Sequence, residues 1–279
     1  MKIDRDAWLS DIFGYNVFSV SLTVPQSVSP SVLQSFSRSL LQSRSLSISP
    51  TERLSDSKTE RLIEGRAFYY TKVPTDRVDL AQALSSAGFN VVDVNVTFIR
   101  RTTDGRPRTA VGGQELSVVV QDILPAHYDT ILNIAASCFV YSRFHLDPEI
   151  PKEIANAIKR AWVDSYIQKA RGERLLVGLL DGKPVGFLAV LATIFNGEPC
   201  RVIDLIGVDR AYQGCGVGKT LVSFFIEQHG DNGTLLRVGT QVANVPSMRL
   251  YESLGFRMAE TTYVLHAHVN AKSDNEDRR

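Results

Sequence analysis

Three glycines at alternate positions, Gly214, Gly216 and Gly218, form the part of this sequence best suited to chemistry. They follow an apolar, β-branched run at 202–208 that predicts a buried strand, and they open an amphipathic stretch at 217–228 that predicts a helix. Glycines in such a turn let backbone N–H groups converge at the N-terminus of the helix, an arrangement that binds phosphate or pyrophosphate. The sequence therefore predicts a phosphate-binding loop, with a purely structural turn as the alternative.

Three phosphate-binding patterns can be compared with this turn. It ends in Gly-Lys-Thr at 218–220, as a Walker A loop does, but that pattern needs a glycine where the chain has Gln213. A dinucleotide-binding fingerprint needs a third glycine where Lys219 stands. The third pattern, Gln/Arg-x-x-Gly-x-Gly/Ala, is satisfied by Gln213, Gly216 and Gly218. In this the segment closely resembles the pyrophosphate loop of the GNAT superfamily of N-acetyltransferases.

A second block downstream supports the resemblance. Asn244 is followed seven positions later by Tyr251 and then by Glu-x-x-Gly-Phe at 252–256. Pro246 suits the first turn of a helix and Gly255 suits its end, so Tyr251 is predicted on a helix, where the usual role of a tyrosine is in the core. The same order resembles the last sequence block of the GNAT superfamily, in which the Asn contacts the coenzyme and the Tyr hydroxyl lies near the thioester sulfur. Two motifs in the right order and separation predict acetyl-CoA binding.

The resemblance also implies how such a site would work. In this family the strand before the glycine turn bulges and splays from its neighbour, so that the pantetheine arm pairs with the open edge. A backbone N–H at the strand end then polarises the thioester carbonyl, as an oxyanion hole does. The residues that the resemblance places at this strand end are Ile206, Gly207 and Val208.

The CoA pyrophosphate would bind to backbone amides of the turn and to the N-terminus of the helix behind it. Lys219 would add positive charge there, with a solvated lysine at a helix start as the alternative, and Cys215 is interpreted as a small residue of the turn rather than a nucleophile. The residues implied in this role are Gln213, Gly214, Cys215, Gly216, Val217, Gly218 and Lys219.

Two further residues complete the implied site. Asn244 would hydrogen-bond the pantetheine arm. Tyr251 would be the catalytic acid, because a phenol with a pKa of about 10 keeps its proton at neutral pH and can donate it to the departing thiolate. The resemblance thus implies direct acetyl transfer in a ternary complex, with acetyl-CoA as the cosubstrate.

The acceptor side is less defined. Many protein N-terminal acetyltransferases of this superfamily carry a glutamate near the position of Gly239, and its absence here weakens a peptide-acceptor interpretation. The general base stays open among Asp204, Glu198, His145 and a chain of water molecules. Arg143, between the first two helices of the domain, is the candidate substrate-binding residue, because an arginine there could pair with a nucleotide diphosphate. A surface salt bridge is the alternative for this arginine.

Several segments resemble more specifically the TDP-fucosamine acetyltransferase group, which acetylates an amine on a nucleotide-linked deoxysugar. These segments are 237–244, 141–144 with Pro148, 261–266, 12–18 and 87–98. The resemblance spans most of the chain and implies an amino sugar nucleotide as the acceptor. Acetylation of a protein or peptide N-terminus, or of another small amine, stays open. So does an acetyl-CoA-binding interaction module without catalysis.

Composition agrees with a soluble cytoplasmic enzyme. The 279 residues, 44% hydrophobic and 22% charged, are enough to bury a sizeable core. The formal net charge of +1 gives no reason to expect a nucleic acid or a membrane as partner. The cysteines Cys138, Cys200 and Cys215 are scattered, and neither they nor the five histidines show the spacing of a disulfide framework or a metal site, so no metal is expected. A homodimer stays open as the assembly.

The length exceeds that of one acetyltransferase domain, so two units are expected. We predict a small N-terminal α/β unit with a Ser-rich segment at 1–101, a linker at 102–115, the GNAT domain at 116–269 and a charged tail at 270–279. The fold class is α/β (α+β), with a central mixed, splayed sheet flanked by helices. The expected strands are 67–73, 91–98, 116–120, 175–180, 185–194, 202–208, 235–239, 256–260 and 263–268. The expected helices are 77–87, 126–138, 151–169, 217–228 and one that contains Tyr251.

Overall fold

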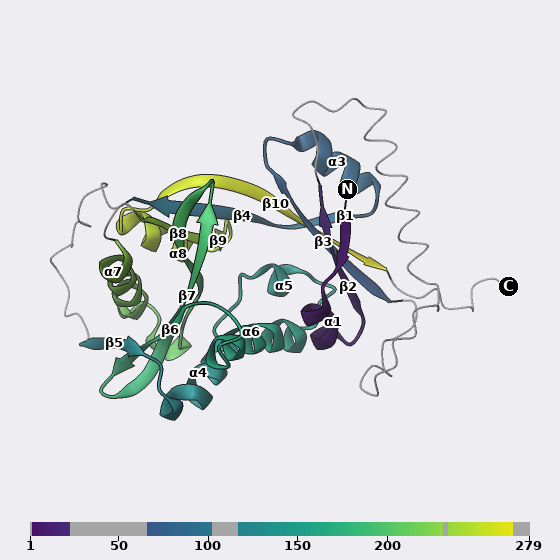
Figure 1. Ribbon diagram of the computed structural model, residues 1–279. Helices are drawn as coiled ribbons and strands as arrows, with labels where there is room; N and C mark the ends of the chain where they lie inside the picture. Colours follow the sequence, from purple (N-terminus) through teal and green to yellow (C-terminus); the bar gives the residue numbers. More distant parts are fainter. Residues whose placement is uncertain (1, 23–65, 102–116, 231–233, 270–279) are drawn as a thin grey trace. The chain divides into compact units, whose positions relative to one another are not determined.

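The computed structural model of the chain describes residues 2–22, 66–101, 117–230 and 234–269 (Figure 1). Three predicted segments lie outside the described residues: the Ser-rich segment at 27–57, the linker at 102–115 and the tail at 270–279. The chain folds as two compact units. Unit 1 contains Met1–Val94, Asp147–Glu149 and Thr262–Arg279, and unit 2 contains Asn95–Leu146 and Ile150–Thr261. Each unit is therefore assembled from separate stretches of sequence.

Unit 1 is built on a small mixed sheet. Strand β1 (Lys2–Arg5) runs antiparallel to β2 (Asn16–Ser21), and β2 runs parallel to β3 (Ala67–Pro74). The helices of this unit are α1 (Ala7–Phe13) and α3 (Val78–Ser86). Helix α1 begins where the side chain of Asp6 accepts a hydrogen bond from the backbone N of Leu9, and it ends at Gly14 with φ of 72°. The sequence predicts β3 and α3, whereas β1, α1 and β2 were not predicted.

The last strand corrects one expectation. Two strands are predicted at 256–260 and 263–268, but β10 (Arg257–Val269) is continuous. Thr261 and Thr262 at the expected break are β-branched residues that favour extended backbone, and no glycine or proline interrupts them. Residues Thr262–Val269 are held in unit 1 by antiparallel pairing with β3.

Unit 2 contains the larger mixed sheet. Strands β5 (Val118–Asp122), β6 (Arg174–Leu180), β7 (Lys183–Phe195) and β8 (Glu198–Val208) pair antiparallel in chain order. Strand β9 (Leu235–Gln241) lies parallel to β8, and its other edge pairs antiparallel with the end of β4 (Asn90–Arg100). The turn between β6 and β7 places Asp181 and Gly182 at φ of 49° and 75°, which is the two-residue hairpin that the Asp-Gly sequence predicts.

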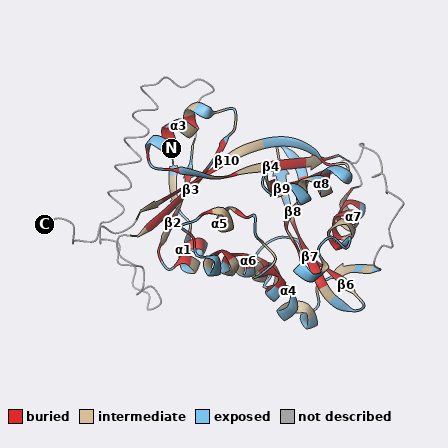
Figure 2. Cartoon of the chain, turned by 180° about the vertical axis from the view of Figure 1, so that it is seen from behind, coloured by how far each residue is buried: buried red, intermediate tan, exposed pale blue. Residues whose placement is uncertain are grey.

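Helices cover both faces of this sheet because alternate strand residues point to opposite sides (Figure 2). Val177 and Phe187 pack with α4 (Tyr128–Ala135) and α6 (Lys152–Ile167). Their neighbours Leu176 and Leu188 pack in the cluster of α7 (Val217–His229) and α8 (Val245–Ser253). The segment between α4 and α6 contains a further short helix, α5 (Arg143–Leu146). None of the helices in the described part of the chain combines the length and apolar character of a membrane-spanning segment.

Strands β8 and β9 separate part of the way along their length. They pair only from Cys200–Ile203 to Leu235–Val238, although β8 continues to Val208. Beyond that point β8 stays paired with β7, with a register shift at Ala189/Val190, and β9 stays paired with β4. The backbone of residues 205–208 therefore has no ladder partner in β9, and the sheet is splayed at the end of β8 that leads into the glycine turn.

Candidate active site

The glycine turn presents the N-terminus of α7. Gly214 and Gly216 have φ of 78° and 88°, a left-handed conformation that suits glycine. Gly216 is the N-cap of α7, and no side chain caps this helix. The first N–H groups of a helix have no acceptor within it, so an anion at this end of α7 would meet them directly. Residues 213–216 are exposed, as a loop that receives a ligand must be.

The side chain of Gln213 connects the turn to the end of β8. Its Nε2 donates a hydrogen bond to the backbone oxygen of Val208 across 3.1 Å. Between them, Asp209 caps the short helix η3 (Arg210–Tyr212) by accepting from the backbone N of Ala211 at 2.9 Å. These two side chains hold the start of the turn. Cys215 is exposed within the turn, and its Sγ lies 3.7 Å from the carbonyl of Gln213.

The end of β8 packs tightly on the sheet face that carries α4 and α6. A Cβ at Gly207 would lie 2.6 Å from Phe187 and 2.7 Å from the Sγ of Cys138, closer than real Cβ contacts allow. Gly207 is therefore required by packing against Phe187, its partner in the sheet, and Cys138. Ile206 and Val208 point to the opposite face, where they pack against the cluster that contains α7 and α8.

Asn244 and Tyr251 lie at opposite ends of α8 and share a neighbour. Asn244 is the N-cap, and its side-chain oxygen accepts from the backbone N of Ser247 at 3.3 Å. Tyr251 is only 2% exposed, and its ring lies 5.9 Å from that of Phe98 and 6.0 Å from that of Phe256. Burial raises the pKa of Tyr251, and a hydrogen bond from the Ser247 hydroxyl opposes this only in part. The phenol therefore stays protonated.

Residues 128–256 match the acetyltransferase (GNAT) family. The chain carries a GNAT acetyltransferase domain. Within the chain, a stretch of 143 residues is 28% identical to the spore coat polysaccharide biosynthesis protein SpsD of Bacillus subtilis, covering 51% of this chain and 48% of that protein. A stretch of 110 residues is 34% identical to human N-acetylaspartate synthetase, covering 37% of this chain and 34% of that protein. The matched part therefore spans less than half the length of either relative.

Solved structures agree on the fold. A GCN5-related N-acetyltransferase from Sphaerobacter thermophilus superposes with a TM-score of 0.55 at 12% identity, covering 96% of this chain and 77% of that one. At this identity the likeness concerns the fold alone. The matched residues 128–256 include β8 and β9, the glycine turn and the helix that carries Tyr251.

The GNAT domain gives Asp204, one of the candidate bases, a full set of hydrogen-bond donors. Its Oδ2 accepts from Trp162 Nε1 at 2.9 Å, from the Tyr166 hydroxyl at 2.7 Å and from Arg171 Nε at 2.7 Å, and its Oδ1 accepts from Arg171 at 3.0 Å. Burial opposes ionisation of Asp204, but these donors outweigh it and hold the pKa of the carboxyl below its usual value. Asp204 thus joins α6 to β8 as an acceptor.

The other two candidate bases also have partners. Glu198 is half-exposed and forms an ion pair with Arg101 at 2.8 Å. His145 on α5 lies between the Ser142 hydroxyl, 2.6 Å from its Nδ1, and the Asn156 side-chain oxygen, 3.0 Å from its Nε2. Burial lowers the pKa of His145, so this histidine is neutral at physiological pH. His145 lies on the same short helix, α5, as Arg143, the candidate substrate-binding residue.

Two cations lie in the region of α5 and α6, where the sequence predicts substrate binding. Arg143 stacks its guanidinium over the ring of Phe144, 4.4 Å from the ring centroid. Lys159 on α6 is only 7% exposed, and it was missed at the sequence level. A signal was present, because Lys159 interrupts the apolar stripe of α6 formed by Ala155, Ile158 and Val163. A lysine inside such a stripe is unusual enough to mark for function.

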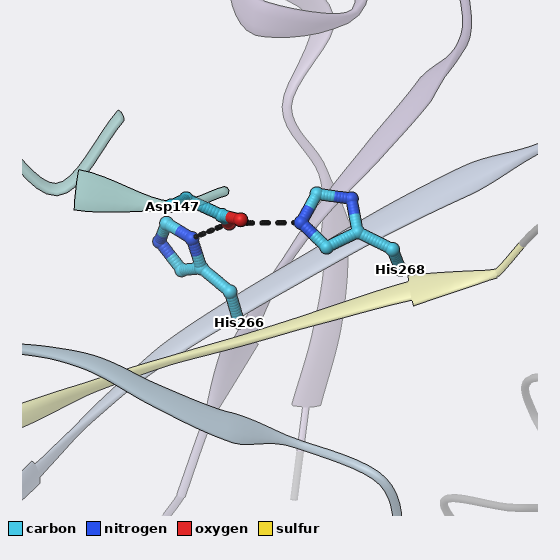
Figure 3. A group of neighbouring side chains, drawn as sticks. All are labelled: Asp147, His266 and His268. Carbon is cyan, nitrogen blue, oxygen red and sulfur yellow. Dashed lines mark hydrogen bonds and ion pairs between the residues drawn. The ribbon is translucent and has the colours of Figure 1, made fainter. Parts of the chain in front are cut away.

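Unit 1 contains a cluster that sequence spacing could not reveal (Figure 3). The Oδ2 of Asp147 lies 2.6 Å from His266 Nδ1 and 2.8 Å from His268 Nε2. The three side chains offer ligand atoms of the kinds that bind transition metals. The two separations are hydrogen-bond lengths, so in this arrangement Asp147 serves as the acceptor for both imidazoles. Burial works against the charged carboxyl, yet the two histidines hold the pKa of Asp147 well below its usual range.

Proposed function

We propose that this chain transfers the acetyl group of acetyl-CoA to a primary amine by direct transfer in a ternary complex. The observation that carries the proposal is the adjacency of two open backbone features. The uncapped N-terminus of α7 follows directly on the end of β8, whose edge toward β9 is unpaired from residue 205 onward. The first suits the pyrophosphate of CoA, and the second suits an extended pantetheine arm.

In the proposed reaction the neutral amine nitrogen attacks the thioester carbonyl carbon, the C–S bond breaks, and the proton that the nitrogen carries after attack passes to solvent water. A backbone N–H at residues 206–208 would polarise the carbonyl oxygen. Tyr251, held protonated by burial, would give its proton to the departing CoA thiolate. Asn244 would orient the pantetheine arm, although its side-chain oxygen already caps α8, so its amide nitrogen is the group that would donate.

For the acceptor we propose an amino sugar nucleotide. The similarity to a polysaccharide biosynthesis protein, SpsD, supports this choice, as do the segments that resemble TDP-fucosamine acetyltransferases. A small amino acid is the second candidate, because five of the further relatives are N-acetylaspartate synthetases, from mammals, a frog and a fish. A protein or peptide N-terminus is less favoured, since Gly239 stands where a carboxylate would be expected.

The test is release of CoA thiol from acetyl-CoA with a panel of amines, followed by mass analysis of the acetylated product. The panel contains TDP-linked aminodeoxysugars, free amino acids and short peptides. Acetylated product from an amino sugar nucleotide would support the proposal in full. Product only from amino acids, or only from peptides, would support acetyl transfer but show that the acceptor is an amino acid or a peptide instead. Tight acetyl-CoA binding in a thermal-shift assay without product from any amine would favour the interaction module instead.

A further inference from the structure

The buried lysine of α6 has no acidic partner. Lys159 is 7% exposed, and no carboxylate in the described part of the chain lies within salt-bridge distance of its ammonium group. Its contacts are instead aromatic: the ammonium lies 4.9 Å from the ring centroid of Phe139 and 4.8 Å from that of Trp162. Buried charges are normally paired, so an unpaired lysine in this position requires an explanation.

The surrounding charges make the position less favourable for a cation. Burial and the nearby Arg143 lower the pKa of Lys159 to about 8, and only Asp204 and Cys138 act in the opposite direction. Asp204 is occupied by its donors from Arg171, Tyr166 and Trp162, and burial raises the pKa of the Cys138 thiol to about 12, so it carries no charge. Arg143 and Lys159 thus bring two positive side chains together, and the carboxylate that acts on Lys159, Asp204, is already ion-paired with Arg171.

The lysine lies near the strand end that would hold the thioester. Cys138 contacts the backbone at Gly207, as the short distance to a Cβ there shows, and Phe187 is paired with Gly207 in the sheet. Phe139, next in sequence, packs its ring 6.3 Å from Phe187 and also contacts Lys159. A chain of direct contacts therefore runs from Gly207 to the ammonium group, all within unit 2.

We propose that Lys159 and Arg143 form a subsite for an anionic group of the acceptor, a carboxylate or a phosphate, so that the physiological acceptor is a negatively charged amine. The role of this subsite in turnover rests on the proposed acetyltransferase function. An anion would supply the missing counter-charge for Lys159 and would be bound by charge-assisted hydrogen bonds. The aromatic rings of Phe139 and Trp162 hold the ammonium in place before the anion arrives, which lowers the entropy lost on binding.

A direct binding experiment tests the subsite without any turnover. The chain has two tryptophans, and Trp162 lies against Lys159, so in the variant Trp8→Phe the tryptophan fluorescence reports on this position. We expect a saturable fluorescence change on titration with inorganic phosphate or with acetate at constant ionic strength. The change should disappear in Trp8→Phe/Lys159→Met and persist in Trp8→Phe/Lys152→Met, since Lys152 is an exposed lysine of the same helix. An equal response in the Lys159→Met background, or no saturable response at all, would overturn the subsite.

Lys159→Met is a suitable variant because methionine keeps most of the aliphatic stem and removes a buried charge, which a core tolerates well. Circular dichroism and thermal unfolding confirm that the variant is folded before any titration is interpreted.

Matched acceptors test the role of the subsite in turnover. The pairs are glucosamine 6-phosphate with glucosamine and β-alanine with β-alaninamide, so the phosphate and carboxylate arms are separate. We expect Lys159→Met to reduce kcat/KM for the anionic member of the preferred pair about ten- to hundredfold, chiefly through KM, with a smaller effect on the neutral member. In the native protein, the ratio of kcat/KM for the anionic acceptor to kcat/KM for the neutral acceptor should fall as the pH rises through about 8, where Lys159 loses its proton. In Lys159→Met this ratio should be independent of pH.

The two proposals fail in different ways. Loss of kcat for neutral and anionic amines alike in Lys159→Met would mean that Lys159 acts on the amine itself, which overturns the subsite and leaves acetyl transfer in place. Lysine-dependent anion binding without acetylation of any amine would retain the subsite and refute the proposed function.

Discussion

Gln213 donates a hydrogen bond to the backbone oxygen of Val208, and this contact joins the two halves of the proposed coenzyme site. The acceptor is the last residue of β8, and the donor begins the glycine turn that leads into α7. The distance between the open strand edge and the helix N-terminus is therefore set by a side chain. Gln213 is thus part of the sequence pattern, and its hydrogen bond also holds the start of the glycine turn against β8; we call this contact the Gln213 clamp.

The clamp predicts the effect of Gln213→Ala. Loss of one hydrogen bond costs about 1 kcal/mol, so the dissociation constant of acetyl-CoA should rise about fivefold, with a smaller change in kcat. Isothermal titration with acetyl-CoA measures the dissociation constant, and the thiol-release assay measures kcat. Gln228→Ala, at the exposed end of α7, is the control and should bind normally. A fall in kcat at unchanged affinity would contradict the clamp.

Gly207 and Gly218 predict different effects of alanine on stability. At Gly207 the new methyl group would collide with Phe187 and Cys138, so Gly207→Ala should lower the free energy of unfolding by about 1–3 kcal/mol. At Gly218 the nearest atom to a Cβ is Leu250 Cδ2 at 3.5 Å, an ordinary contact, so the same change should leave stability nearly unaltered. Urea unfolding of both variants provides the comparison. Equal stabilities would show that the strand end is packed more loosely than the distances indicate.

The features that the sequence predicted correctly are those encoded by neighbouring residues. The turn at 181–182, the helix at 217–228 and the helix of Tyr251 each depend on a local pattern of glycine, proline and apolar spacing. Long-range features were missed. Asp147 is separated from His266 by 119 positions, and no local sequence pattern around either residue predicts that they form a hydrogen bond. The continuous β10 was wrongly divided at Thr261 and Thr262, because its pairing with β3 from Thr262 onward is also a long-range feature.

Asp147 predicts a loss of stability in acid. Its pKa in the folded chain lies below the unfolded value of about 3.9, so its contribution is complete above that value and is lost as the pH falls below it. Asp147→Asn should therefore cost about 1–3 kcal/mol at pH 7, where the amide faces two imidazoles without a charge, and less at pH 3. Chemical unfolding at both pH values measures this. Asp11→Asn, at an exposed position of α1, should show no such difference. If Asp147→Asn lowers the free energy of unfolding by the same amount at both pH values, Asp147 is not charged in the folded chain.

Asp204 predicts a structural defect rather than a catalytic one. Three side chains donate to its carboxylate, so Asp204→Asn should reduce the free energy of unfolding by about 1–3 kcal/mol and leave the shape of the pH profile of kcat/KM unchanged. Exposed Asp129 on α4 supplies the control, Asp129→Asn, which should alter neither quantity. If Asp204→Asn instead kept full stability and lost activity more than about a hundredfold, Asp204 would be the general base.

Tyr251 combines a buried ring with a predicted proton donor, and Tyr251→Phe separates these roles. Phenylalanine fills the space between Phe98 and Phe256, so folding and acetyl-CoA affinity should change little. Loss of the acid should lower kcat about 100- to 10,000-fold. Because burial raises the pKa of this phenol above 10, the native protein should lose no activity through Tyr251 ionisation as the pH rises to 10. Stopped-flow thiol release across this range, with Tyr128→Phe as the control, measures both effects. A kcat for Tyr251→Phe equal to that of the native chain would leave the thiolate to be protonated by water, and Tyr251 would then be a core residue alone.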